Sequence, residues 1–343
     1  MSKRPTIHDV AERAGVSKSL VGMVFASSEG VGAVRRERVL RAAAELGYTP
    51  NAWARSLRSS SAGFVGIIVA DFHNPLFTEI ADSARQLLAQ QGVFSFVSVA
   101  SIVDGPAGPV LDPAPIQHLL DLKPSSILIV GGLPDHGPFA SLPEDFPVVI
   151  ALSSATDAPD AAVVRSDDSV AMNLLCAHLR GLGHRHIAYV GPAGRLVADR
   201  RRDEFVAQAR GLDLDFVTVS TGGSTDERGG DEAATAVLSA DPSITAIVCF
   251  NDNVAFGVQD AVSRAMQTGH VPVAVTGYDN TYIAQLERIS LTSIEQETSE
   301  IVRVACGLLA NRDEWRDHRG TETLVDPGLV IRSSTTAVTP LVI

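Results

Sequence analysis

Cysteine is scarce in this sequence, and its placement argues against two kinds of site. The three residues Cys176, Cys249 and Cys306 stand far apart in apolar stretches such as ITAIVCF, with no Cys-x-x-Cys pair and no histidine cluster beside them. We therefore expect buried, inert thiols in a reducing compartment, and neither a disulfide nor a metal site.

Long apolar runs and export signals are also lacking. No apolar run reaches the roughly 18 residues that a membrane-spanning helix needs, and the start MSKRPTIHD has no apolar signal-peptide core. These absences predict a soluble, cytoplasmic protein with no membrane partner.

The common catalytic motifs are missing as well. The glycine-rich stretches GGLPDHG and GPAGR do not have the spacing of a phosphate-binding loop or of Gly-x-Gly-x-x-Gly, and there is no Gly-x-Ser-x-Gly or His-Glu-x-x-His. We expect no enzyme and no cofactor; turnover of a bound small molecule would contradict this.

What the sequence does have is a strong asymmetry of charge. The chain of 343 residues carries a net charge of −12, yet residues 1–62 hold ten Lys and Arg against five Asp and Glu, leaving +5 there and −17 on the remaining 281 residues. A basic N-terminal module on an acidic body favours a polyanion partner for that end.

The N-terminal residues have a helical pattern. Thr6 and Asp9 form a capping-box pattern for a first helix that ends at Gly15, and Ser17 is placed to cap a second helix. A third, RRERVLRAAAELG, should end at Gly47. Its expected inward residues are Val39, Leu40, Ala43 and Leu46.

After Gly63 the pattern changes to short apolar strands separated by amphipathic helices. The strands are FVGIIVA, FSFVSVA, SSILIVGG, FPVVIAL, HIAYVGP, DFVTVS, AIVCF and VAVTGYD. Such alternation predicts parallel sheets, and about eight strands predict two α/β subdomains with a ligand cleft between the strand ends.

Two short helices joined by a turn containing glycine form a helix-turn-helix pattern. The segments TIHDVAERAGVS, RERVLRAAAELGYTPNAWARSLRS and VGIIVADFHNPLFTEI, followed by GHRHIAYVGP, FNDNVAFGV and TGYDN, closely resemble in order and spacing the lac/gal repressor family of bacterial transcription regulators. The resemblance covers essentially the whole chain. It implies an all-α helix-turn-helix headpiece plus hinge helix, joined to an α/β periplasmic-binding-protein-like core of two parallel-sheet subdomains.

The implied domains are a headpiece at 1–47, a hinge at 48–62 and an effector-binding, dimerising core at 63–343. Within the core we expect an N-subdomain at about 63–162 and 292–324 and a C-subdomain at about 163–290 and 325–343. The chain should cross between the subdomains near 161–165, 290–292 and 323–326.

The resemblance implies a palindromic double-stranded DNA operator bound by a homodimer, because one headpiece makes few phosphate and base contacts. In that family a hinge leucine wedges into the minor groove, and Leu57 stands at its place. Ordinary hinge packing is the alternative role for Leu57. The candidate DNA-binding residues are Thr6, Ser17, Lys18, Ser19, Met23, Arg35, Arg36, Tyr48, Asn51, Arg55, Leu57 and Arg58.

The second helix departs from the family pattern. Four places that are usually polar hold Leu20, Gly22, Met23 and Ala26, which removes side chains that contact phosphates or base edges. Lys18 and Ser19 are then the polar side chains of its first turn, and Met23 or Leu20 can pack against a thymine methyl.

Residues near the ends of the core strands and the starts of the following helices are the effector-site candidates. They are Asp71, Phe72, Phe77, Arg195, Arg201, Asn251, Asp252 and Asp279. The resemblance points most firmly to Arg201 and Asp279 as hydrogen-bonding clamps and to Phe77 as a stacking surface. A salt bridge between Arg201 and Asp279 within the core is the competing interpretation.

Together these patterns predict a ligand-responsive, sequence-specific DNA-binding regulator, more specifically a repressor controlled by a small sugar-like effector. The alternative is a sugar-binding sensor with weak or no specific DNA binding. A binding protein of the periplasmic type would leave the basic headpiece without a role.

Overall fold

The computed structural model describes residues 5–25, 31–48, 63–105, 108–156 and 158–336. The chain forms two compact units, Met1–Gly63 and Phe64–Ile343. In the described residues no helix is long and apolar enough to cross a membrane.

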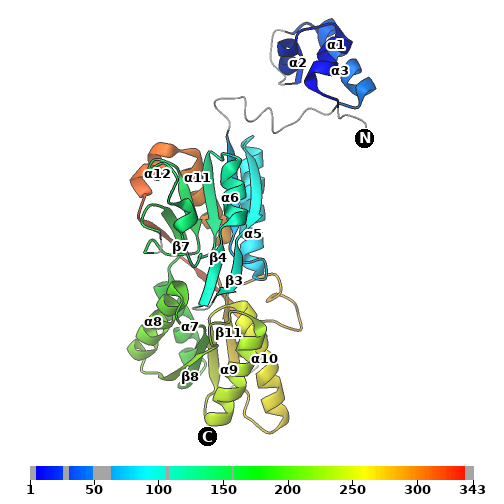
Figure 1. Ribbon diagram of the computed structural model, residues 1–343. Helices are drawn as coiled ribbons and strands as arrows, with labels where there is room; N and C mark the ends of the chain where they lie inside the picture. The colour runs from blue at the N-terminus through cyan, green and yellow to red at the C-terminus, as the bar shows by residue number, and fades with distance from the viewer. Residues whose placement is uncertain (1–4, 26–30, 49–62, 106–107, 157, 337–343) are drawn as a thin grey trace. The chain divides into compact units, whose positions relative to one another are not determined.

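The described residues of the first unit form the helices α1 (Ile7–Ala14), α2 (Lys18–Phe25) and α3 (Ala33–Leu46). Figure 1 shows them packed together, and their shared core contains Val10, Val21, Val24 and Val39. Helices this short are marginal alone, so this small core holds them.

One predicted core position of α3 is wrong. Leu40 is 48% exposed, and Ala42 is buried in its place. Val39, Ala42 and Ala43 stand three and four residues apart and therefore share one face of the helix, whereas Leu40 is turned away from it.

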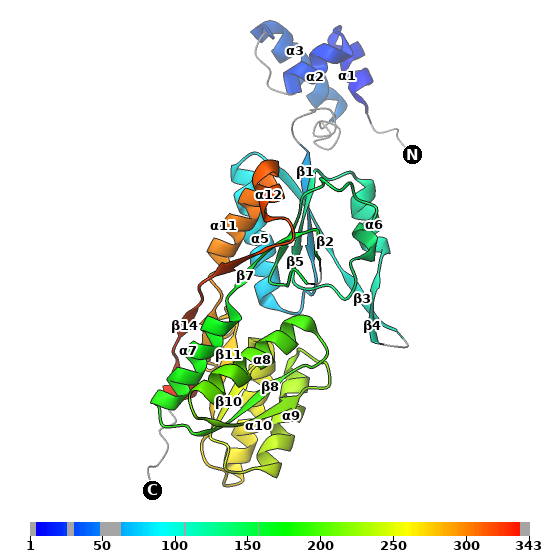
Figure 2. The ribbon, with the colours of Figure 1, turned by 90° about the vertical axis from the view of Figure 1, so that its left-hand side faces the viewer.

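The first subdomain of the second unit is a six-stranded sheet in the order β13-β7-β6-β5-β1-β2, with every neighbouring pair parallel. The helix pair α5 and α11 covers one face and α6 covers the other, as Figure 2 shows. The strands are β1 (Phe64–Val69), β2 (Phe94–Val99), β5 (Ser126–Val130), β6 (Val148–Ala151), β7 (Ala162–Ser166) and β13 (Glu322–Val325). The helices are α5 (Pro75–Gln90), α6 (Ala114–Asp121), α11 (Thr298–Ala310) and, near β7, α12 (Arg312–His318).

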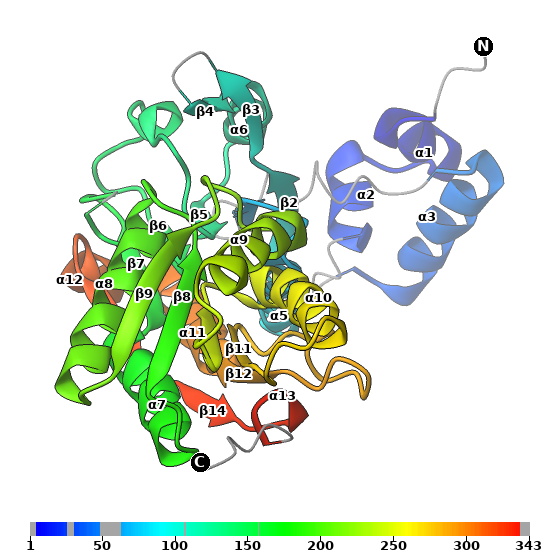
Figure 3. The same cartoon turned by 90° about the horizontal axis from the view of Figure 1, so that it is seen from below.

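The second subdomain is a six-stranded sheet in the order β14-β12-β11-β10-β8-β9, parallel except for the pair β12–β14. Figure 3 shows α7 and α8 on one face and α9 and α10 on the other. The strands are β8 (His186–Gly191), β9 (Asp215–Ser220), β10 (Ala246–Cys249), β11 (Ala274–Tyr278), β12 (Thr292–Glu295) and β14 (Gly328–Val330). The helices are α7 (Asp168–Gly181), α8 (Leu196–Gly211), α9 (Glu227–Ala240) and α10 (Asp252–Gln267).

Three small elements complete the second unit. A hairpin of β3 (Ser101–Gly105) and β4 (Gly108–Asp112) follows β2, the 3-10 turn η1 is Gly137–Phe139, and α13 is Ser333–Thr336. All eight strands expected from the sequence are present.

Two of the three crossings between the subdomains lie further along the chain than predicted. Strand β7 pairs with β6 and β13 in the first sheet, so the first crossing follows Ser166. Strand β12, expected in the first subdomain, pairs with β11 in the second, which moves that crossing to Gln296 and Glu297. The last crossing follows Val325 and lies within the predicted range 323–326. At the first two crossings, strands β7 and β12 continue past the predicted boundary and complete a sheet before the chain crosses.

Candidate functional site

The turn between α1 and α2 is built by local hydrogen bonds. The amide of Thr6 donates to Asp9 Oδ2 at 2.6 Å and the amide of Asp9 donates to Thr6 Oγ1 at 3.4 Å, which closes the predicted capping box. Gly15 ends α1 with a φ of 61°, a value that glycine adopts without strain. Ser17 Oγ accepts from the amide of Leu20 at 3.3 Å and begins α2.

Helix α2 has one buried and one exposed face. Val21 and Val24 are in the core, whereas Lys18 and Ser19 are exposed and Met23 is 40% exposed. The helix-turn-helix therefore presents the first turn of α2 and Met23 to solvent.

The remaining headpiece candidates differ in exposure. Arg35 is exposed, and Arg36 is half-buried with its Nη1 donating to the carbonyl oxygen of Val24 at 3.4 Å. Tyr48 packs on Phe25 with ring centroids 5.8 Å apart. The candidates Asn51, Arg55, Leu57 and Arg58, the hinge helix and Ala26 lie outside the described residues.

In the second unit, polar residues gather where the strands of both sheets end. Asn74 follows β1 and caps α5, Asp168 follows β7 and begins α7, and Asp279 directly follows β11. Because the carboxyl ends of parallel strands lie at one edge of a sheet, these residues meet between the two subdomains.

Asp168 is the centre of the densest cluster of charges. Its Oδ2 lies 2.9 Å from Arg200 Nε, and its Oδ1 accepts from Arg201 Nε at 3.1 Å and from the Tyr278 hydroxyl at 2.8 Å. Burial alone would raise the pKa of Asp168, but the charges of Arg201 and Arg200 and the Tyr278 hydrogen bond outweigh it and lower the pKa. Asp168 is therefore a buried anion.

Arg201 is held on every side by protein groups. Its guanidinium lies 3.5 Å from the ring centroid of Tyr278 and 4.8 Å from that of Phe250, and its Nη1 donates to the Phe250 carbonyl oxygen at 2.6 Å. Its carboxylate partner is Asp168 and not Asp279, so the salt bridge weighed for the pair Arg201 and Asp279 is not formed here.

Asp279 is held by two amides from different parts of the chain. Asn74 Nδ2 donates to its Oδ2 at 3.0 Å, and Gln296 Nε2 donates to its Oδ1 at 2.7 Å. Burial raises the pKa of Asp279 although Arg201 and both amides oppose the shift. Since Asn74 belongs to the first subdomain and Asp279 to the second, this contact joins the two.

Asp252 is buried and turned toward its own subdomain. Its Oδ2 accepts from the amide and the hydroxyl of Thr281, at 2.7 and 2.9 Å, and its Oδ1 accepts from the Ser293 hydroxyl at 2.6 Å. Burial and then the charge of Asp279 raise its pKa. These contacts tie α10 to the loop after β11 and to β12.

The other effector candidates do not all reach this cluster. Asn251 is buried and caps α10, its Oδ1 accepting from the Val254 amide at 2.9 Å. Phe77 is half-buried against the first core, and Asp71 accepts from the His73 amide at 2.8 Å. Two candidates are exposed, Phe72 and Arg195.

Several residues of this cluster are absent from the candidates predicted from the sequence. They are Asn74, Arg165, Asp168, Arg200, Tyr278 and Gln296. Asn74 had a recognisable signal as the N-cap before Pro75, but the pairing of Asp168 with Arg201 depends on the packing of α7 against α8 and has no sequence signal.

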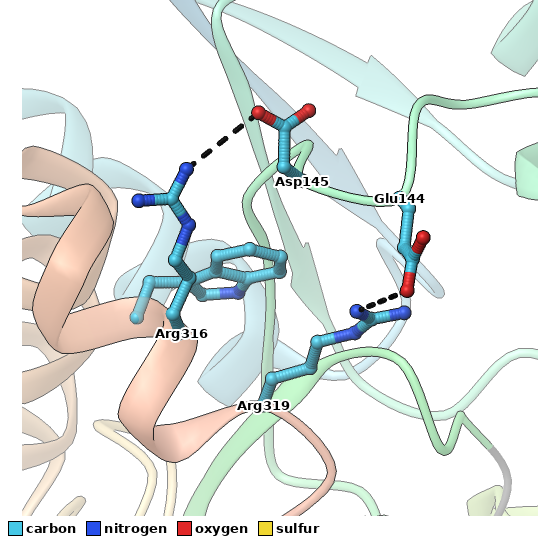
Figure 4. Close-up of a pocket in the computed structure, with 5 residues that line it drawn as sticks. Glu144, Asp145, Arg316 and Arg319 are labelled. Carbon is cyan, nitrogen blue, oxygen red and sulfur yellow. Dashed lines mark hydrogen bonds and ion pairs between the residues drawn. The ribbon is translucent and has the colours of Figure 1, made fainter.

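A surface pocket on the first subdomain lies at the end of α12 and is lined by Glu144, Asp145, Trp315, Arg316 and Arg319 (Figure 4). Its charged groups pair with each other, Arg319 with Glu144 at 3.4 Å and Arg316 with Asp145 at 3.7 Å. Trp315 is buried and donates to the Val148 carbonyl oxygen at 2.9 Å. These contacts attach α12 to the loop before β6, which is a structural role.

The described residues contain no group of three or more His, Cys, Asp or Glu that could hold a metal ion. All three cysteines are buried free thiols. Burial raises the pKa of Cys176 to about 12 and that of Cys306 to about 11, so both are protonated at neutral pH.

Both units are similar to domains of known proteins. Residues 6–51 match the model of the bacterial regulatory proteins of the lacI family, and residues 176–335 match a periplasmic binding protein-like domain. The maltose regulon regulatory protein MalI of Escherichia coli is 30% identical over 311 residues, covering 88% of this chain and 87% of MalI. The transcriptional regulator MalR of Streptomyces coelicolor is 31% identical over 345 residues, covering 95% of each chain. The structure of the lac repressor dimer bound to operator and an anti-inducer superposes with a TM-score of 0.79 at 24% identity, covering 97% of this chain and 99% of that one.

Proposed function

This chain belongs to the lacI family of bacterial regulatory proteins and is a DNA-binding transcriptional regulator, and we propose that it is a homodimeric repressor controlled by a sugar-like effector. The effector binds between the two subdomains of the second unit, at the cluster around Asp168, Arg201 and Asp279.

The DNA side of the proposal rests on the headpiece. Its exposed α2 face carries Lys18 and Ser19, and Arg35 is exposed at the start of α3. One such helix contacts few bases and phosphates, so useful affinity requires two headpieces on a palindromic site. This is the reason for a homodimer, as in the operator complex of the lac repressor.

The effector side rests on one observation: buried charged groups of both signs in the second subdomain meet the Asn74 amide of the first subdomain where the strands end. The carboxylates of Asp168 and Asp279 are acceptors and the guanidinium of Arg201 is a donor, a combination that suits the hydroxyl groups of a sugar. A relative named for the maltose regulon agrees with this ligand class.

The same groups supply a mechanism of control. In this structure Arg201 and Asp279 are satisfied by Phe250, Asp168, Asn74 and Gln296. An effector that takes over some of these hydrogen bonds binds the open and the closed arrangement of the subdomains with different affinities. This difference in affinity shifts the equilibrium between the two arrangements. Because Asn74 and Asp279 come from different subdomains, a ligand hydroxyl that replaces their contact acts directly on subdomain closure.

The test begins with selection of random duplexes by the full-length chain, followed by a salt titration of the best binder. We expect a palindrome whose affinity falls steeply as salt rises. Sugars of increasing size are then screened for release of the chain from that duplex.

Arg201→Lys is expected to remove the effector response by losing the planar guanidinium, while Arg202→Lys keeps it. Arg202 is the matched control because its partners are Asp199 and Asp203 on the surface of α8. Binding of a sugar without enrichment of any duplex would leave a ligand sensor without specific DNA binding and overturn the repressor proposal.

A further inference from the structure

The exposed face of α2 has an unusual chemistry for a helix that reads DNA. Positions 18 and 22 are four residues apart, as are 19 and 23, and 19 and 22 are three apart, so the four share one face, which holds Lys18, Ser19, Gly22 and Met23. Val21 and Val24 occupy the opposite, buried face. Most of the reading face is therefore small or apolar.

Helix α2 offers few side-chain donors and acceptors for hydrogen bonds to base edges. Guanine is read best by a bidentate Arg or Lys, and adenine by a bidentate Asn or Gln. Helix α2, with the sequence KSLVGMVF, contains no Arg, Asn, Gln, Asp or Glu. The Ser19 hydroxyl lies 3.0 Å from that of Ser17, which leaves Lys18 as the long polar side chain of the helix.

Met23 and Gly22 offer a different kind of contact. Met23 is an unbranched, polarisable apolar side chain that is 40% exposed, and the one apolar group in the major groove is the C5-methyl of thymine. A Cβ at Gly22 would have no heavy atom within 4 Å, so the protein leaves this part of the helix surface open. The backbone of α2 can thereby approach the bases more closely than a helix with a side chain at this place.

The charge of the surrounding surface fits the same partner. Lys18 on α2 and Arg35 and Arg38 on α3 are exposed, and within the described headpiece the acids Glu45 and Glu37 pair with Arg13 and Arg41. Exposed cations beside an apolar reading face fit a duplex whose phosphates attract the headpiece and whose bases present methyl groups.

We propose that α2 reads thymine at one position of each operator half-site, through contact of Met23 with the C5-methyl group and with Gly22 allowing the close approach. This inference rests on the proposed function, since it specifies the DNA that the regulator takes.

The test replaces thymine by deoxyuridine, one position at a time, in both halves of the duplex selected by the full-length chain. This change removes the methyl group and keeps every hydrogen bond of the base pair. At one thymine per half-site we expect affinity to fall roughly fourfold per methyl, the factor that corresponds to burying one such group, and more than tenfold for both halves.

Met23→Ala should weaken binding of the thymine duplex by a similar factor and should make binding insensitive to deoxyuridine at that position. Leu40→Ala is the matched control, because Leu40 is a comparably exposed apolar residue on the outer side of α3. It should retain both the affinity and the methyl sensitivity.

The outcomes separate the two proposals. A palindrome that is enriched but tolerates deoxyuridine at every thymine would overturn the methyl reading and leave the regulator intact. Sensitivity that persists in Met23→Ala would assign the methyl contact to another residue and overturn the role of Met23. If no duplex is enriched at all, the repressor proposal fails and this inference fails with it. The deoxyuridine series on the unaltered chain does not depend on whether any variant folds.

Discussion

At the scale of single residues, the buried aspartates of the second unit differ in what stabilises them. Asp168 is surrounded by Arg200, Arg201 and the Tyr278 hydroxyl, which lower its pKa despite burial. Asp252 accepts hydrogen bonds from the neutral groups of Thr281 and Ser293, and burial together with the charge of Asp279 raises its pKa. Equal burial thus produces opposite pKa shifts because the first carboxylate has cationic partners and the second has an anionic neighbour.

Because of its raised pKa, ionised Asp252 lowers the stability of the folded chain, and the size of this effect depends on pH. Since its pKa is higher in the folded chain than in the unfolded one, the folded state binds the extra proton, and its stability falls as pH rises from about 4 toward neutrality. Asp252→Asn removes the charge, its Oδ1 can still accept from Thr281, and the Ser293 hydroxyl can turn to accept from its Nδ2.

We expect Asp252→Asn to be as stable as the unaltered chain or more stable at pH 7, and to lose that advantage near pH 4. Urea midpoints measured across this range test it, with the exposed Asp203→Asn as the control for a lost negative charge. An equal loss of stability at both pH values would contradict the prediction and assign the cost to the altered hydrogen bonds.

At the scale of elements, two helical glycines have opposite surroundings. Gly22 on α2 is open, whereas a Cβ at Gly257 on α10 would lie 1.7 Å from the carbonyl oxygen of Glu227 on α9. A Cβ at Gly230 on α9 would likewise lie 2.1 Å from the carbonyl oxygen of Val254 on α10. The close packing of α9 on α10 therefore depends on these two glycines, and the packing of α2 does not depend on Gly22.

Gly257→Ala is expected to destabilise the second unit by about 1–3 kcal/mol, because the added methyl group pushes the backbone of α10 away from the backbone of α9. It should also displace Glu227, which begins α9. Denaturant unfolding followed by circular dichroism measures the loss, and an unchanged midpoint would show that the two helices can separate without cost.

Gly22→Ala is expected to have the opposite effect on stability. In a helix interior alanine is favoured over glycine by roughly 0.8–1 kcal/mol, and the new methyl group meets no neighbour. The headpiece should melt at a higher temperature by circular dichroism while operator affinity falls, because the helix can no longer approach the bases as closely. Unchanged affinity would argue against a deep position of α2 in the groove.

The elements also show what the sequence could predict. The eight apolar strands and the helices between them follow from the sequence pattern, and all are found. Six further strands of the described residues were missed, namely β3, β4, β7, β12, β13 and β14. Among them β7, β12 and β13 contain charged residues and β14 is three residues long, so that pairing with distant strands decides them. The same limit applies to the site. Asp279 directly follows a strand and Arg201, within α8, was expected from the family resemblance, but the Asn74–Asp279 contact joins residues 205 apart in sequence.

At the scale of the whole second unit, one short loop joins the subdomains at three points. His73 Nε2 lies 3.1 Å from Glu227 Oε2, the His73 carbonyl oxygen accepts from Asn253 Nδ2 at 3.4 Å, and Asn74 contacts Asp279. The Glu227 hydrogen bond raises the pKa of His73 against the effect of burial, with the charges of Glu227, Asp71 and Asp226 adding to the shift. Protonated His73 therefore favours the closed arrangement of the subdomains.

The sign of this effect predicts a pH-dependent closure. A histidine whose pKa is raised contributes its stabilisation fully below about pH 6.5, and the contribution is lost as pH rises through the raised pKa. Because the side chains of His73 and Glu227 are 62% and 45% exposed, the pair is worth about 0.2–1 kcal/mol, which changes the closure equilibrium by a factor of up to roughly five.

Closure can be followed by energy transfer between two dyes, one attached to Gln117→Cys in α6 and the other to Ala236→Cys in α9. Both positions are exposed, and the native thiols are buried, so the dyes attach at the two introduced cysteines.

We expect energy transfer in the effector-free chain to indicate a more closed arrangement of the subdomains at pH 6 than at pH 8. Labelled chains are mixed with an excess of unlabelled chain, so that transfer within one chain is measured and not transfer between the two chains of a dimer. His73→Gln and Glu227→Gln should each reduce this response, and the double variant should add little to either, because the two residues act as one pair. His118→Gln on the surface of α6 is the control and should respond as the unaltered chain does. Asp252 and Asp279 also titrate with raised pKa values near the subdomain interface. A full pH response in His73→Gln would therefore assign the closure to these carboxylates and contradict the role given to the His73 loop.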